Sequence, residues 1–341
     1  MCTNFKTPVA EDGSVVVGRS LDYPPDLGFS LCVIPRDLAR VARAADDSAP
    51  TKMWTTRHGV VGLAVTGNDA AMIDGMNTAG LSAHLLYMVG GFFHAAQFRG
   101  DGTDVSQLEL VSYLLSTCAT IAEVRSALDE VNVWGWDGGM PFTPPVHVLV
   151  HDRDGSAAIE FQPDGMVVLD NPTSVGTNSP YLEWHLLNLH NYVGFSSANP
   201  QGQRVRPRVG GMNIRPLGVG WGMRGIPGDY TGPSRFVRAI ALTTLAETPR
   251  DGHDAEMLTL HVLNTFDVPP GVVKEPGPDH SVVNEVTYAD TIANLTDLRY
   301  AYRALDDPTV YVVNLNTTNF NEGACRFREL SATGDFTEVT V

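Results

Sequence analysis

The stretch VHVLVHDRDGSAAIEFQPDGMVVL, residues 146–169, is the part of the sequence that says most about the fold class. Its runs at 146–151, 157–161 and 166–169 are rich in apolar and β-branched residues, and each gap between them contains the pair Asp-Gly. Asp and Gly favour tight turns, and Val and Ile favour strands. The stretch therefore predicts three consecutive antiparallel strands joined by short turns.

Working outward, further strands are expected at residues 14–19 and 309–314. Helices are expected where apolar residues recur at spacings of three and four, at residues 104–118, 121–128 and 234–246. Clusters of strands separated by clusters of helices, without regular alternation, predict an α+β fold built in layers rather than a doubly wound parallel sheet. The sequence contains no repeat and no long polar linker, so residues 1–341 are expected to form a single domain.

The charge balance narrows the possible partners. The chain has 23 Lys and Arg against 39 Asp and Glu, which gives a net charge of −16 and argues against nucleic acid or an anionic membrane surface as a partner. It contains no apolar run of the roughly 18 residues that a membrane span needs. It also lacks a basic start followed by an apolar stretch, so a soluble, cytoplasmic protein is expected. The four cysteines are too few for a disulfide scaffold: Cys2, Cys32, Cys118 and Cys325.

Several motifs that could bind a cofactor or metal lack the required context. Gly220–Gly225, GWGMRG, matches the dinucleotide fingerprint in letters, but no convincing strand precedes it and Pro227 follows too soon for a helix. A glycine-rich surface loop is the better interpretation. His185 and His190 are five residues apart and do not share a helical face, and His84 is expected in the core. No cofactor and no metal are therefore expected.

Cys2 is the most informative single residue. Bacterial initiator Met is normally removed before a small residue, which would leave Cys2 with both a thiol nucleophile and an α-amine of pKa about 7.7–8.0 that can act as its base. On position alone, a chance cysteine at a frayed terminus explains Cys2 equally well. Arg19 lies at the end of the strand expected at 14–19, and Asp22 follows three residues later. If that strand pairs with the one holding Cys2, the thiol gains a cation and the amine a carboxylate.

The sequence resembles the choloylglycine hydrolase family, which includes bile salt hydrolases and penicillin V acylases among the N-terminal nucleophile hydrolases. The matching segments run in order along most of the chain: Met1–Thr3, Gly18–Asp22, Ile34–Arg36, Asp74–Leu81, Thr177–Pro180, Trp184–His185, Pro227–Tyr230 and Ser234–Arg238. The resemblance implies a four-layer αββα sandwich with two antiparallel sheets between helix layers.

The resemblance also implies catalytic roles. Cys2 matches the nucleophile, Arg19 and Asp22 match the Arg and Asp beside it, and Arg235 matches the Arg that closes the polar network around the Asp. Asn178 and the backbone N–H of Tyr87 match the donors of the oxyanion hole. The implied reaction is acyl transfer to Cys2, release of the amine, and hydrolysis of the thioester.

The substrate is less defined. Bile salt hydrolases typically carry Asn at the position of Tyr87 and penicillin V acylases Tyr, which favours a penicillin V acylase-like enzyme for a small N-acyl amide. The alternatives are a bile salt hydrolase, an acylase of N-acyl homoserine lactones, or a catalytically silent binding protein of the same fold. The expected pocket residues are Tyr23, Phe29, Trp134, Trp136, Met140 and Phe142, although Trp134 and Trp136 could equally be a structural plug. Residues 194–228 resemble an extension that packs between subunits, which implies a homotetramer.

Overall fold

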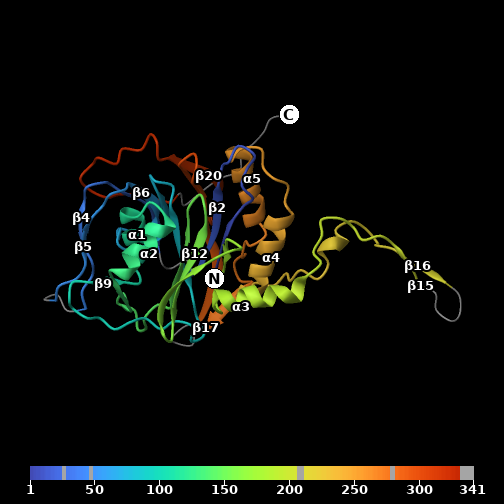
Figure 1. The fold of residues 1–341 in the computed structure, drawn as a ribbon, viewed down its shortest axis with the longest axis horizontal. Coiled ribbons are helices and arrows are strands. Elements are labelled where there is room, and N and C mark those ends of the chain that lie inside the picture. The colour runs from blue at the N-terminus through green and yellow to red at the C-terminus, as the bar shows by residue number, and fades with distance from the viewer. Residues whose placement is uncertain (25–27, 46–48, 206–210, 277–280, 331–341) are drawn as a thin grey trace.

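The computed structural model describes the chain except for residues 25–27, 46–48, 206–210, 277–280 and 331–341 (Figure 1). Its described residues form two large antiparallel sheets. The first has the order β14 (Val175–Gly176), β1 (Cys2–Lys6), β2 (Val16–Tyr23), β18 (Val282–Asn294), β19 (Arg299–Ala304) and β20 (Asp307–Asn314), and β17 (Val273–Pro276) pairs with β18. The N-terminal strand is therefore an inner strand of this sheet.

The second sheet has eight strands among the described residues. Their order is β13 (Gly165–Asp170), β12 (Ser156–Gln162), β11 (Val146–His151), β8 (Ser82–Tyr87), β7 (Met72–Asn77), β6 (Val60–Val65), β3 (Phe29–Ile34) and β21 (Arg326–Glu329). Shorter pairs are β9 (Asp104–Ser106) with β10 (Asn132–Trp134), β4 (Ala39–Val41) with β5 (Met53–Thr55), and β15 (Gln203–Val205) with β16 (Met212–Ile214).

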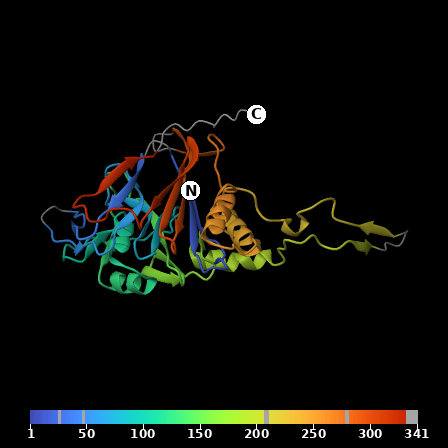
Figure 2. The same cartoon turned by 90° about the horizontal axis from the view of Figure 1, so that it is seen from above.

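Helices cover the outer faces of both sheets. As Figures 1 and 2 show, α1 (Leu110–Thr117) and α2 (Ile121–Asp129) lie outside the second sheet, and α4 (Gly232–Leu245) and α5 (Gly252–Leu263) lie outside the first. Three apolar clusters fill the spaces between these layers, one under each helix pair and one between the two sheets. The α+β class and the αββα layering are confirmed.

The three-strand run around residue 150 is confirmed as β11, β12 and β13 in antiparallel register. The helix expected at 121–128 is confirmed as α2, whose N-cap Thr120 accepts a hydrogen bond from the N–H of Glu123. The helix expected at 234–246 is α4, which begins two residues earlier. The expected strands at 14–19 and 309–314 fall largely within β2 and β20.

The prediction of a helix at 104–118 is wrong for residues 104–109. Residues 104–106 form β9, which pairs in parallel with β10, and α1 begins only at Leu110. The cause is the buried Asp104 carboxylate, which accepts hydrogen bonds from the N–H groups of Arg99 and Gly100 and from the side chain of Asn132. These bonds hold the segment extended, and helical periodicity does not register them.

A long arm, defined here as residues 194–205 and 211–228, projects from the body beyond α3 (Leu182–Asn188) and the 3₁₀ turn η1 (Leu189–Tyr192) (Figure 1). Residues 206–210 of the extension expected at 194–228 lie outside the described residues. The arm carries β15, β16 and a second 3₁₀ turn, η2 (Trp221–Met223). Gly220 precedes η2 with a φ of 82°, the left-handed region that glycine tolerates. Residues 215–220, which lead into this segment, are loop rather than strand, and Leu217 and Val219 in them are exposed, so the segment is a surface loop, as the sequence indicates. Within the described ranges, no helix is long and apolar enough to cross a bilayer.

Candidate active site

Pairing of β1 with β2 places Cys2 opposite Leu21, between Arg19 and Asp22 in the neighbouring strand. The Cys2 side chain is buried, and its Sγ lies 3.4 Å from Nη2 of Arg19. The same guanidinium donates from Nη2 to the Leu85 carbonyl at 2.8 Å and from Nη1 to Asp74 Oδ2 at 3.4 Å. Burial by itself would lower the pKa of Arg19, but Cys2 and Asp74 hold that pKa above its usual value. Arg19 is therefore a permanent cation beside the thiol.

The Asp22 carboxylate is buried beside the start of β1. Its Oδ1 accepts the hydroxyl of Thr287 at 2.7 Å, and burial raises the pKa of Asp22. The α-ammonium group in the chain as it stands belongs to Met1, and it donates to the backbone carbonyl of Asp22 and to Glu285 Oε2, both at 2.8 Å. With Met1 in place, the carboxylate that the amine contacts is that of Glu285, on β18, whereas its contact with Asp22 is to the backbone carbonyl; the pairing of a Cys2 amine with the Asp22 carboxylate stays a prediction.

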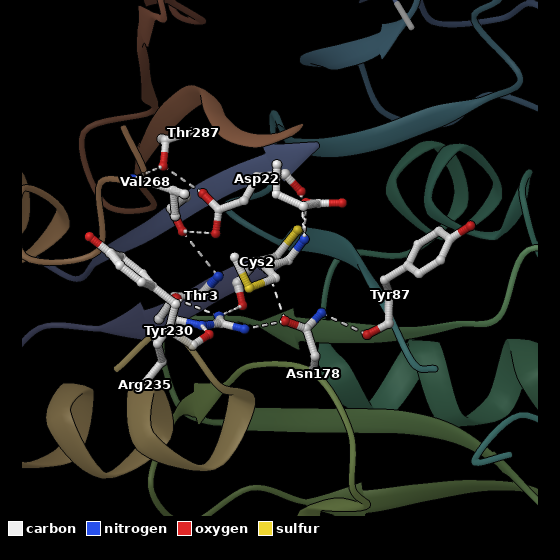
Figure 3. Close-up of polar contacts among 12 residues, drawn as sticks. Cys2, Thr3, Asp22, Tyr87, Asn178, Tyr230, Arg235, Val268 and Thr287 are labelled. Carbon is white, nitrogen blue, oxygen red and sulfur yellow. Dashed lines mark hydrogen bonds and ion pairs between the residues drawn. The ribbon is translucent and has the colours of Figure 1, made fainter. Parts of the chain in front are cut away.

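Asn178 follows β14 and connects Cys2 to Arg235 and Tyr87 (Figure 3). Its Oδ1 accepts the backbone N–H of Cys2 at 3.0 Å and also a hydrogen bond from Nη2 of Arg235. Its Nδ2 donates to the carbonyl of Tyr87 at 2.7 Å. The side-chain amide of Asn178 is therefore fixed between the N-terminal strand and the end of β8.

Arg235 reaches this network from the first turns of α4. It donates to the carbonyl of Cys2, to Thr3 Oγ1 at 2.9 Å and to the Tyr230 carbonyl at 2.9 Å. Burial lowers the pKa of Arg235, and the negative charge of Asp22 opposes that shift. The side chain thus positions Cys2 and Asn178 directly and balances Asp22 through space.

Tyr87 is the last residue of β8. The next residue, Met88, donates its N–H to the Pro145 carbonyl at 2.8 Å, toward β11. Because successive N–H groups in a strand point in opposite directions, the N–H of Tyr87 points away from β11. The pairing of β7 with β8 ends at Asp74 and His84, before Tyr87 is reached. The Tyr87 N–H and Asn178 Nδ2, which donates to the Tyr87 carbonyl, therefore lie at the same end of β8, and Tyr87 lines one pocket with Cys2.

An apolar pocket with a volume of about 90 Å³ opens onto Cys2. Tyr23, Phe29 and Met140 line it, as expected from the sequence. The Tyr23 ring contacts Phe29 and Tyr87 edge-on, with ring centroids 5.9 and 6.2 Å apart. Other lining residues that the sequence analysis did not identify are Leu21, Val65, Ala71, Ile73, Leu85, Leu86, Leu108, Pro144 and Val146.

The structure places the other three expected pocket residues elsewhere. Trp134 is buried on β10 and packs edge-on against Phe98, so it is a structural plug. The backbone of Trp136 is held by Gln107, and its ring lies under the guanidinium of Arg43. Phe142 lines a separate groove next to Tyr87. The β9–β10 pairing turns this segment toward the core, and no local pattern in the sequence indicates that.

The other thiols are poor candidates for a nucleophile. Burial raises the pKa of Cys118 to about 11 and that of Cys325 to about 12, and it raises the pKa of Cys32 further still. None of these three residues lines the pocket. His84 is a core histidine, as expected, 2.6 Å from Asp74. In the described part of the chain, no group of three or more His, Cys, Asp or Glu side chains is placed to hold a metal ion.

Comparison with known proteins identifies the family. The family model of linear amide C–N hydrolases, choloylglycine hydrolase family, matches residues 2–328. The chain is 28% identical to the conjugated bile acid hydrolase of Lactobacillus gasseri, over 85% of this chain and 89% of that protein. It is 24% identical to the penicillin V acylase of Pectobacterium atrosepticum, over 89% of this chain and 78% of that protein.

A crystal structure of a variant conjugated bile acid hydrolase from Clostridium perfringens shares the fold, with a TM-score of 0.85 and 23% identity over 99% of this chain and all of that one. Enzymes of this family hydrolyse carbon–nitrogen bonds other than peptide bonds. On the match over residues 2–328, this chain is a hydrolase that belongs to the linear amide C–N hydrolases of the choloylglycine hydrolase family.

Proposed function

We propose that Cys2 is the nucleophile of an N-acyl amide hydrolase and becomes the N-terminal residue when Met1 is removed. The observation that carries this proposal is the position of its thiol, 3.4 Å from the Arg19 guanidinium at an apolar pocket. The thiolate sulfur attacks the amide carbon, and the carbonyl electrons move onto the oxygen. Asn178 Nδ2 and the Tyr87 N–H stabilise that oxyanion.

The freed α-amine of Cys2 acts as the base and then the acid. It takes the thiol proton and delivers it to the leaving nitrogen as the C–N bond breaks, which leaves a thioester on Cys2. Water then attacks the thioester carbon and gives a proton back to the amine–thiol pair, so that the carboxylic acid leaves and the enzyme is restored. While Met1 is attached, the Cys2 nitrogen is an amide that donates to Asn178 Oδ1 and cannot accept the proton.

The substrate class best supported by the comparisons is conjugated bile salts. Bile salt hydrolases are more similar to this chain than the penicillin V acylase is, so the preference for an acylase drawn from the sequence is the weaker interpretation. The pocket supports a bulky apolar acyl group, since its walls are almost entirely aliphatic and aromatic side chains.

Penicillin V acylase activity is the second candidate, and one observation favours it. Tyr87 contacts Tyr23 edge-on beside Cys2, and an aromatic face there suits a phenoxy ring, a contact worth about 0.5–1.5 kcal/mol. The test compares kcat/KM for glycocholate, penicillin V and an N-acyl homoserine lactone in the wild type and in Tyr87→Asn. A higher wild-type value for penicillin V would overturn the bile salt assignment and leave the Cys2 mechanism intact.

We further propose that the arm mediates assembly into a homotetramer. It projects from the body and exposes large apolar side chains, among them Met212, Leu217 and Val219. Such side chains on a projecting segment are typical of subunit contacts. Light scattering after size-exclusion chromatography should give a tetramer for the wild type and a smaller species for the double variant Leu217→Asp/Val219→Asp. The cytoplasmic location stays a prediction from the sequence.

A further inference from the structure

Two buried histidines from different elements hydrogen-bond the backbone of residues 177 and 178. His147 lies on β11 and His185 on α3, and their residues are 4% and 2% exposed. Both line a small cavity together with Glu160, Gly176 and Phe236. The catalytic pocket and this cavity share no lining residue.

The hydrogen bonds of the two rings fix their protonation. His147 Nε2 lies 2.8 Å from the Thr177 carbonyl, and His185 Nε2 lies 2.9 Å from the Asn178 carbonyl. A carbonyl oxygen only accepts, so each Nε2 carries a proton and donates. Burial lowers the pKa of both His147 and His185 to about 4, so both rings are neutral at pH 7. Each Nδ1 is therefore a bare acceptor.

Both bare acceptors are buried and lack a protein partner. Nδ1 of His147 and Nδ1 of His185 are inaccessible and make no hydrogen bond to the described chain. The polar side chains nearby are already engaged. The two oxygens of Glu160 accept from the Leu182 N–H and the Gln162 amide, and the Thr177 hydroxyl donates to the Gly232 carbonyl. Burying such an acceptor without a donor costs about 1–3 kcal/mol.

Two acceptors can be joined only by a group with two donors, and a water molecule has two O–H groups. The cavity that both rings line has a volume of about 10 Å³, at the lower limit of the roughly 10–15 Å³ that one water molecule needs. We infer that a single water molecule bridges Nδ1 of His147 and Nδ1 of His185, and that this bridge positions the segment carrying Asn178.

The Nε2 side of each ring connects the water to the segment that carries Asn178. With Nδ1 held by the water, the two imidazoles present their Nε2–H groups to the carbonyls of Thr177 and Asn178, the two residues after β14. These bonds fix the backbone from which the Asn178 amide points to Tyr87. His147 and His185 are thus positioning residues. This functional part rests on the proposed oxyanion role of Asn178, whereas the water site does not.

A crystal structure of the wild type at pH 7 and about 1.5 Å resolution tests the water directly. The expected result is one ordered water at about 2.7–3.2 Å from both Nδ1 atoms. An empty cavity, or a protein group bonded to either Nδ1, would overturn the inference. Because this readout needs no turnover, it is independent of whether Cys2 is the nucleophile.

Kinetics of His147→Gln test the positioning role. The Gln amide can still donate to the Thr177 carbonyl, but it has no counterpart to Nδ1, so the bridge is lost. We expect kcat to fall about tenfold and KM to stay within about twofold of the wild-type value. The loss of kcat should be smaller than the factor of about 10²–10³ that removal of a whole oxyanion donor costs. The matched control is His151→Gln, four residues along β11, whose ring bonds Ser156 and Asn4 and not the backbone that carries Asn178.

The control should lose stability and keep kcat within about threefold of the wild type. An unchanged kcat in a folded His147→Gln would refute the positioning role, as would an equal loss of kcat in both variants. If His147→Gln does not fold, His185→Gln measured in the same way takes its place. Activity in Cys2→Ala would remove the proposed function while the water remained.

Discussion

Replacing Asp74 with Asn tests the buried ion pair between Asp74 and Arg19, next to Cys2. The Asp74 carboxylate is fully buried, and it lies 2.6 Å from the Tyr300 hydroxyl, 2.6 Å from His84 Nδ1 and 3.4 Å from Arg19 Nη1. Burial by itself would raise the pKa of Asp74, but His84 and Arg19 bring it below its usual value, so the group is ionised at pH 7. Asn has nearly the same size and no charge, so Asp74→Asn leaves Arg19 buried without its counter-charge.

The size of the expected loss of unfolding free energy depends on the hydrogen bonds that Arg19 keeps in Asp74→Asn. Breaking a buried ion pair costs about 3–5 kcal/mol because the remaining charge stays out of water. Arg19 retains its hydrogen bonds to the carbonyls of Ile73 and Leu85, which places the expected loss of unfolding free energy at the lower end, about 3 kcal/mol. With a urea m value of about 3 kcal/mol/M, the unfolding midpoint falls by about 1 M.

Equilibrium urea unfolding at pH 7, followed by tryptophan fluorescence, measures this loss. The control is Asp254→Asn, which removes an exposed ion pair between the first turn of α5 and Arg250, just before that helix, and should leave the midpoint unchanged. A midpoint shift of less than about 0.2 M for Asp74→Asn, with an unchanged m value, would refute the reasoning that Arg19 depends on Asp74.

Three further predictions concern the site and its surroundings. Asn178→Ala should lower kcat by about 10²–10³ with little change in KM in steady-state assays, because an oxyanion donor acts in the transition state; a rise in KM alone would make Asn178 a substrate-binding residue. Cys32→Ala and Cys118→Ala should keep most of the activity and its sensitivity to iodoacetamide, since neither thiol lines the pocket; loss of that sensitivity would move the nucleophile away from Cys2. The free energy of unfolding should fall as the pH is lowered from 6.5 to about 4. In this range His147 and His185 bind a proton in the unfolded chain but not in the folded protein, where their pKa values are about 4. Each histidine contributes about 3 kcal/mol to that loss at pH 4, and urea midpoints should therefore fall less steeply with pH in His147→Gln than in the wild type.

The sequence predicted those parts of the fold that local chemistry controls. The Asp-Gly turns and apolar runs of residues 146–169 produce β11, β12 and β13, and Thr120 caps α2 as its position indicates. The start of α1 could not be predicted in this way. Asp104 holds its segment extended through Asn132, and a contact across 28 residues leaves no periodic signal.

The same limit applies to the site. Arg19 and Asp22 could be placed beside Cys2 because one strand pairing brings them there. Glu285 and Thr287 come from β18, more than 260 residues from their partners, and no motif marks them. Trp134 was expected to be either a pocket wall or a plug, and only the β9–β10 pairing shows that it is a plug.

Intact-mass analysis of the acyl-enzyme tests the central claim most directly. The enzyme is mixed with excess substrate, quenched in acid within milliseconds and digested for peptide mapping. The account predicts a chain that lacks Met1 and carries one acyl group, with the N-terminal peptide beginning at Cys2 and bearing the acyl group as a thioester. An acyl group on any other residue, or a fully active preparation that retains Met1, would contradict it.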